Sequence, residues 1–238
     1  MKTPFTSAAA IVAALCFSAI SAHAQTWNFD TNDQGWLVHD LNGSGDYVAS
    51  ISTYAVDYHS TGGNTGGFIS GTDRSGGSFF LEAPTSDLGN YTVFNGGKLN
   101  FSLTTDQSVD FVDDSVVIFR GSASNLTIVT AITPLPNANW SNYSIDLNAS
   151  NFHYGNLAGG VVSTSDFSAI MADLTDVSID GEYHVGISET TGLDSVAFVR
   201  ANVGSGAVPE PSTYGILGAL TLAGATLLRR KSKAKSAV

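Results

Sequence analysis

The sequence contains little cysteine and little positive charge. Its one cysteine, Cys16, lies in an apolar stretch near the amino terminus, so residues 25–207 cannot form a disulfide within the chain. Of the 10 Lys and Arg residues, six lie outside residues 25–207, which carry 4 basic and 20 acidic side chains and a net charge of −16. Because such a domain repels phosphates, we exclude nucleic acid and anionic lipid as its partners.

The sequence also lacks the common catalytic motifs. It has no Gly-x-Ser-x-Gly nucleophile elbow, no His-Glu-x-x-His zinc helix and no phosphate-binding glycine loop. The histidines after residue 24 are far apart and share no metal-ligand spacing: His39, His59, His153 and His184. A glycosidase needs only two carboxylates about 5–10 Å apart, a condition that some pair among so many acids always meets. We predict that the protein is not an enzyme, with a polysaccharide-active glycoside hydrolase as the alternative.

The amino-terminal segment, MKTPFTSAAAIVAALCFSAISAHAQ, has the pattern of a signal peptide. Lys2 gives the positive start, residues 8–20 form the apolar region, and Ala22-His23-Ala24 supplies the small residues of a cleavage site. We therefore predict that residues 1–24 are a signal peptide and that the protein is exported.

Residues 204–238 form a second segment unlike the rest. A hinge is followed by an apolar run at 213–228 and a basic tail at 229–235. The run is shorter than the roughly 20 residues of a typical transmembrane helix, so it is a marginal anchor. Because basic residues stay on the cytoplasmic side, we predict a single transmembrane sorting helix with the main domain outside.

The three parts of this tail resemble the PEP-CTERM sorting signal of Gram-negative bacteria. The residues that carry the resemblance are Val208, Pro209, Glu210, Pro211, Arg229 and Arg230. The resemblance implies an exosortase as a partner, which processes the tail after a transient stay in the inner membrane. It further implies a final location at the cell surface or in the extracellular matrix, with association to exopolysaccharide.

Between the two end segments, residues 25–203 are predicted to form one all-β domain. Short runs rich in Val, Ile, Phe and Thr are bounded by Gly, Asn, Asp and Ser, which is typical of strands in a sandwich. We expect strands at 98–105, 115–121, 125–132, 142–148, 182–188 and 194–201.

One stretch has helical spacing instead. Candidate caps at 163–166 precede Phe167, Ile170, Met171 and Leu174, which predicts a helix at about 165–174. Residues 40–78, rich in Gly, Ser, Thr and Asn, are expected to be long loops around one or two weak strands. The predicted fold is a jelly-roll-like β-sandwich with one short helix, plus the signal peptide and the sorting helix.

Several features over residues 79–199 occur in a specific order. They are FFLEAP, GGKL, WSNY, the helix segment FSAIMADL and the closing LDSV. This order resembles the laminin B (domain IV) module. The resemblance implies a β-sandwich with an extracellular-matrix role and supplies no catalytic residues, and it implies that Trp140 lies in the core. Laminin modules lie between cysteine-rich repeats, which this chain lacks.

The opening WNFDTNDQGW resembles the first strand and turn of jelly-roll domains of the carbohydrate-binding type. In such domains a structural calcium often joins the first strand to the last, and the matching positions here are Asp30, Asp33 and Asp194. Carboxylate and carbonyl oxygens are the ligands that calcium prefers. In the alternative, Asp30 and Asp33 only make the turn before Gly35.

For a glycan ligand, the sequence offers loop aromatics. Tyr54 and Tyr58 lie in STYAVDYHSTGG, and Phe152 and Tyr154 lie in NFHYGN. Exposed aromatic faces stack on sugar rings, which makes these residues candidates for a binding surface. The favoured function is a non-enzymatic module that binds exopolysaccharide or another surface glycan; a self-associating structural matrix protein is a further alternative.

Overall fold

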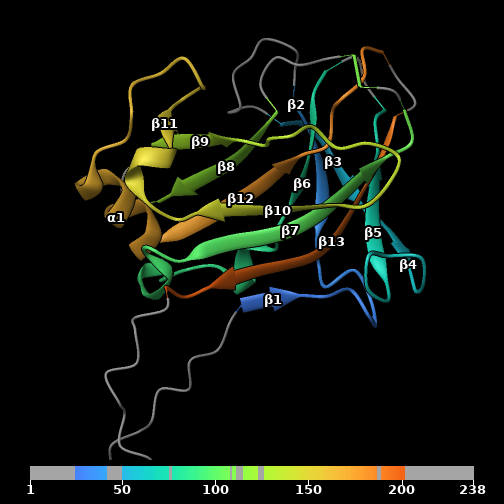
Figure 1. Ribbon diagram of the computed structural model, residues 1–238, viewed down its shortest axis with the longest axis horizontal. Coiled ribbons are helices and arrows are strands. Elements are labelled where there is room, and N and C mark those ends of the chain that lie inside the picture. Colours follow the sequence, from blue (N-terminus) through green and yellow to red (C-terminus); the bar gives the residue numbers. More distant parts are fainter. Residues whose placement is uncertain are drawn as a thin grey trace, which may run out of the picture.

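The computed structural model describes residues 25–41, 50–74, 77–107, 109–110, 115–122, 126–186 and 189–201. Within these residues two antiparallel sheets form a β-sandwich with one short α-helix (Figure 1). The all-β prediction is therefore confirmed. The predicted signal peptide, the sorting motif and the transmembrane run lie outside the described residues. No helix within the described ranges is long and apolar enough to cross a membrane.

The first sheet has the order β10-β7-β13-β5-β4, with β1 paired to the far part of β13. Its strands are β1 (Gln25–Trp27), β4 (Asp57–His59), β5 (Phe68–Thr72), β7 (Lys98–Thr105), β10 (Ser141–Asp146) and β13 (Thr190–Val199). Figure 1 shows β10, β7 and β13 side by side, with β5 and β4 continuing the sheet.

The second sheet has the order β11-β9-β8-β12-β6-β2-β3. Its strands are β2 (Leu37–Leu41), β3 (Ser50–Ala55), β6 (Phe79–Glu82), β8 (Val116–Gly121), β9 (Thr127–Ala131), β11 (His153–Tyr154) and β12 (Leu174–Asp180). Three 3₁₀ turns complete the described elements: η1 (Thr85–Asp87), η2 (Thr92–Phe94) and η3 (Ala149–Asn151).

The core lies between the two sheets and follows the alternation of the strands. In β7, Leu99, Phe101 and Leu103 are buried against the other sheet, because every second side chain of a strand points to the same face. Trp27 and Trp36 are both buried and meet edge to face, with ring centroids 5.5 Å apart. The predicted strands at 98–105, 115–121, 125–132 and 142–148 are confirmed within one or two residues.

The predicted helix is also confirmed, as α1 (Thr164–Ala172). Ser163 caps it, since its hydroxyl accepts a hydrogen bond from the Asp166 amide (3.1 Å). Phe167, Ile170 and Met171 face the core. The helix ends before Leu174, which belongs to β12 instead.

Two expectations about strands are wrong. Residues 182–186 are a loop, because the amides of Tyr183 and His184 donate to the Glu189 carboxylate and not to a neighbouring strand. The glycine-rich stretch at 40–78 contains β3, β4 and β5 among its described residues, which is more strand than the sequence indicated.

Candidate functional site

A groove of about 600 Å³ lies on the outer face of the first sheet. Ile69, Leu103 and Leu193 point into the core, so their strand neighbours point away from it. These outward side chains line the groove and come from β4, β5, β7 and β13, which lie side by side in Figure 1. Four of them carry hydroxyl groups: Ser70, Thr72, Thr104 and Thr190.

Aromatic rings form one wall of this groove. His59 and Phe68 stack with centroids 4.3 Å apart and planes 11° apart, and Phe68 meets Trp140 edge to face at 5.3 Å. The Trp140 indole Nε1 donates to the carbonyl of Gly62 (3.0 Å), which fixes the ring beside the groove. A Cβ on Gly192 would lie 3.1 Å from the Trp140 ring, so a larger residue there would crowd the indole.

This wall was only partly predicted. Tyr58, one of the predicted ligand residues, lies in β4 and lines the groove, and its hydroxyl donates to the carbonyl of Asp30 (3.1 Å). Phe68 was missed because it opens β5 inside a stretch that was expected to be loop. Trp140 was expected in the core, but it is only partly buried; its ring contacts Phe68, which lines the groove, although Trp140 is not itself a lining residue.

The other three predicted ligand residues lie elsewhere. Phe152 is fully buried between Phe119 and Phe167, so its prediction as an exposed platform is wrong. Tyr154 is half-buried at the start of α1, where its hydroxyl donates to Asp166. That contact gives Tyr154 a role in holding the helix in place.

Tyr54 lies at the end of the sandwich, away from the aromatic wall. Its hydroxyl donates to the carbonyl of Thr72 (2.7 Å) and lies 3.1 Å from Asp40 Oδ1. Burial, with the nearby Asp40 charge, raises the pKa of Tyr54 above its usual value. The Arg74 guanidinium lies 4.1 Å from the ring centroid, so the exposed face of this ring is already covered.

The loop between β4 and β5 contacts two of the three predicted calcium ligands. Asp194, in the middle of β13, is fully buried, and its Oδ2 accepts a hydrogen bond from the Thr65 amide (2.9 Å). A Cβ on Gly63 would lie 2.8 Å from Asp194 Oδ2, and a Cβ on Gly66 would lie 2.3 Å from Asp30 Oδ1. Asp30 and Asp194 therefore pack against the same loop, which has to be glycine at these points.

Carbonyl oxygens gather around the same loop. A Cβ on Gly67 would lie 2.2 Å from the Phe29 carbonyl oxygen and 2.9 Å from that of His59, and a Cβ on Gly63 would lie 2.5 Å from that of Gly67. Phe29 and Ser195 have φ values of 51° and 55°, a conformation that non-glycine residues adopt at an energetic cost. Carboxylate and carbonyl oxygens together form the donor set that suits calcium.

Asp33 has a different role. Its Oδ1 accepts a hydrogen bond from the Gly35 amide (3.0 Å) and its carbonyl accepts one from Trp36 (3.1 Å), so it makes the turn. No three His, Cys, Asp or Glu side chains among the residues that the structure describes are spaced to hold a metal ion. An ion at the loop would therefore need backbone carbonyls as ligands, and calcium there stays a prediction.

Buried carboxylates lie behind one end of the groove. Glu189 is buried; its Oε1 accepts a hydrogen bond from the Thr105 hydroxyl (2.7 Å), and its Oε2 accepts from the amides of Tyr183 (2.7 Å) and His184 (2.9 Å). Burial raises the pKa of Glu189. Because Thr105 lines the groove, Glu189 lies directly behind its wall.

Glu182 belongs to the same group. Burial, followed by the charges of Asp73, Glu189, Asp40 and Asp110, raises the pKa of Glu182 to about 8. Its Oε2 is buried and has no hydrogen-bond partner within the described part of the chain. Glu182 therefore holds its proton at neutral pH, because a second buried negative charge is unfavourable there.

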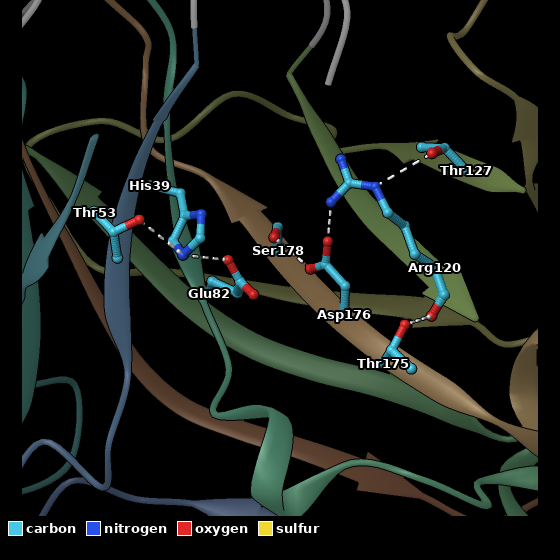
Figure 2. A network of polar contacts seen from close by, with 8 residues as sticks. All are labelled: His39, Thr53, Glu82, Arg120, Thr127, Thr175, Asp176 and Ser178. Atoms are coloured by element: carbon cyan, nitrogen blue, oxygen red, sulfur yellow. Dashed lines mark hydrogen bonds and ion pairs between the residues drawn. The ribbon is translucent and has the colours of Figure 1, made fainter. Parts of the chain in front are cut away.

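The outer face of the second sheet carries another polar cluster, which Figure 2 shows. His39 Nε2 lies 2.7 Å from Glu82, and the Arg120 guanidinium pairs with Asp176. Asp176 also accepts a hydrogen bond from the Ser178 hydroxyl (2.6 Å). Each carboxylate in this cluster thus has a basic or hydroxyl neighbour, an arrangement that stabilises strand pairing.

Comparison with known protein families matches the main domain and the carboxyl-terminal tail to one family each. Residues 80–212 match the family described as Laminin B (Domain IV), and residues 207–231 match the PEP-CTERM protein-sorting motif. These matches confirm the two resemblances, and together they indicate an exported, cell-surface protein. None of the curated proteins matches the chain.

Two solved structures are similar in fold. The L4b domain of human laminin alpha-2 superposes with a TM-score of 0.58 at 14% identity, covering 75% of this chain and 99% of that domain. The family 11 carbohydrate-binding module of the cellulosomal cellulase Lic26A-Cel5E of Clostridium thermocellum gives a TM-score of 0.46 at 14% identity, covering 76% of this chain and 96% of that module. Since the laminin B match spans more than half of the sequence, the chain belongs to the laminin B (domain IV) family.

Proposed function

We propose that the domain is a non-enzymatic module that binds exopolysaccharide or another surface glycan in the groove of the first sheet. One observation carries this proposal: stacked and edge-to-face aromatic rings stand beside a row of hydroxyl groups in an open groove. Aromatic faces supply contact area for sugar rings, and hydroxyl groups supply hydrogen bonds that orient them.

The PEP-CTERM tail supports the rest of the proposal. A sorting signal at residues 207–231 directly follows the domain, so exosortase would deliver the groove to the outside of the cell. We propose that the tail holds the protein transiently in the inner membrane, and that processing then leaves it at the surface or in the matrix.

Replacing Trp140 by alanine tests the groove. We expect Trp140→Ala to weaken binding of the producer's own exopolysaccharide about tenfold, or about 1.4 kcal/mol, because the substitution removes the ring that packs against Phe68 and extends the aromatic wall beyond the lining residues. Isothermal titration calorimetry of the purified protein measures the affinity. Val161→Ala, at an exposed site that does not line the groove, is the control and should bind like the wild type.

Two results would contradict glycan binding. The wild-type protein could fail to bind any polysaccharide, or Trp140→Ala could bind as tightly as the wild type while melting at the same temperature. If the protein instead released new reducing ends from the polysaccharide, the hydrolase alternative would replace the binding module.

We further propose that calcium binds at the loop of residues 62–67, held by Asp30, Asp194 and backbone carbonyls. An ion that binds only the folded protein stabilises it by about 2.7 kcal/mol at 100 times its Kd, which raises the melting temperature by about 5–11 °C. We expect this rise in the wild type and its loss in Asp194→Asn. Differential scanning calorimetry with calcium and with a chelator measures it.

Asp33→Asn is the matched control, because Asp33 makes the neighbouring turn. It should retain the response to calcium. An equal response of Asp194→Asn and the wild type would show that the ion binds elsewhere, and no response in the wild type would remove the site altogether.

A further inference from the structure

The groove carries negative charge without a basic counterpart. Asp57 on β4 and Asp106 after β7 both line it and are exposed. Asp106 Oδ1 accepts a hydrogen bond from the Thr190 amide (2.8 Å), which fixes the direction of that carboxylate. Among the described residues that line the groove there is no Lys or Arg, and neither Asp57 nor Asp106 takes part in an ion pair that the structure shows.

The few basic side chains of the domain lie elsewhere. Residues 25–207 contain four of them, and three are engaged outside the groove: Arg74 over Tyr54, Lys98 with Asp146, and Arg120 with Asp176. The fourth, Arg200, follows β13 at its far end and does not line the groove. A uronate or sulfate group in the groove would therefore meet carboxylates without a compensating cation.

A group of buried acids lies behind one end of the groove. Glu189 lies behind Thr105, which lines the groove, and Asp73 and Glu182 lie near Glu189. Burial first, and then the neighbouring carboxylates, raise the pKa of Glu182, which favours its neutral form. The exposed Asp57 and Asp106 therefore supply the charge that a ligand in the groove meets. His59, the remaining titratable side chain of the aromatic wall, is hydrogen-bonded to Ser70 (2.9 Å) and stacked on Phe68.

We propose that the groove selects glycans with protonated amino groups, such as de-N-acetylated amino-sugar polymers, and rejects glycans with uronate or sulfate groups. The sugar ring stacks on the aromatic wall of Phe68 and Trp140, and its ammonium groups pair with Asp57 and Asp106. This selectivity rests on the proposed function, because it requires that the groove bind glycans at all.

Four oligosaccharides of equal length test the proposal: a glucosamine oligomer, its fully N-acetylated form, a neutral β-glucan and an oligogalacturonate. Titrations are done on the full chain at mildly acid pH, where the glucosamine amine is charged. We expect the glucosamine oligomer to bind about three- to tenfold more tightly than its acetylated form, from two partly exposed ion pairs. Added salt should reduce this difference, and the galacturonate should bind most weakly.

Isosteric substitutions assign the effect to the groove. Asp57→Asn and Asp106→Asn remove a charge without changing side-chain size, and each should lower the preference for the glucosamine oligomer about two- to threefold. Asp146→Asn is the matched control: it removes an equal charge from β10 on the same sheet, but Asp146 does not line the groove. It should leave the preference unchanged.

The outcomes separate this inference from the proposed function. If acetylated or neutral sugars bind as tightly as the glucosamine oligomer, the charge selectivity is wrong and glycan binding stands. If none of the four binds, both proposals fall. If all three aspartate variants reduce the preference equally, the attraction comes from the net charge of the domain, and the assignment to the groove is overturned.

Discussion

Phe198→Ala is expected to lower the free energy of unfolding by about 3–5 kcal/mol, because truncating a buried phenylalanine removes apolar contacts and leaves a cavity. Phe198, on β13, is fully buried, and its ring contacts those of Tyr91 (4.8 Å between centroids), Phe94 (5.6 Å), Phe119 (5.9 Å) and Trp27 (6.4 Å). These rings come from both sheets and from the segment between β6 and β7, so the cavity would weaken several elements at once.

Chemical denaturation of the purified protein measures this loss, and the melting temperature should fall by about 6–20 °C. The neighbouring Val199→Ala is the control, because Val199 points to the opposite face and is 37% exposed. It should cost at most about 1 kcal/mol, the range of strand propensities. A loss below about 1 kcal/mol in Phe198→Ala would contradict the packing described for this core.

Stability is expected to fall as the pH rises from mildly acid to mildly alkaline values. Glu182 has a pKa of about 8 in the folded protein against 4.5 for an ordinary glutamate. The folded state therefore keeps a proton that the unfolded chain releases, and the stability linked to this proton is fully present below pH 4.5 and is lost as the pH rises through about 8. Asp180 and Glu189 act in the same direction, because burial raises the pKa of both.

The variant Glu182→Gln tests how much of this pH dependence comes from Glu182. The amide has the shape of the protonated acid and cannot ionise, so the variant should match the wild type at low pH and melt several degrees higher at alkaline pH. Melting curves across the pH range measure both slopes. Asp166→Asn is the control. Hydrogen bonds from Tyr154 and Ser163 lower the pKa of Asp166, so the stability linked to Asp166 is lost as the pH falls, which is opposite to the dependence expected for Glu182. Parallel slopes in Glu182→Gln and the wild type would show that Glu182 is not the group that titrates.

Local patterns in the sequence predicted the parts of the fold that local forces determine. The alternation in β7 and the capping serine of α1 act over a few residues, so they could be read directly. The loop at 182–186 could not, because its amides are satisfied by a carboxylate beyond the end of the run. The strand β5 was hidden by its glycine-rich flanks, which serve close packing around Asp30 and Asp194.

The site was harder to predict than the fold because its residues converge from distant segments. The pattern Trp-x-x-Tyr suggested a buried Trp140, yet residues three apart in extended chain point to opposite faces. Tyr143 takes the core side, where it stacks on Phe101 at 5.1 Å, and Trp140 is left on the outside. No sequence signal places Trp140 beside Phe68, since β7 and β13 lie between β10 and β5 in the sheet and the two rings meet over Gly192, which has no side chain.

The pairing of β1 with β13 has a mechanical consequence. Gln25 lies opposite Phe198, so the described chain enters and leaves the domain at the same end (Figure 1). A pull on the carboxyl-terminal tail enters the domain at the end of β13, which is hydrogen-bonded to β7 along most of its length and to β5 and β1 over its two halves. If the opposing force acts on a ligand in the groove, the load runs along β13, and the hydrogen bonds of β13 to β7 and β5 are expected to resist it together in shear.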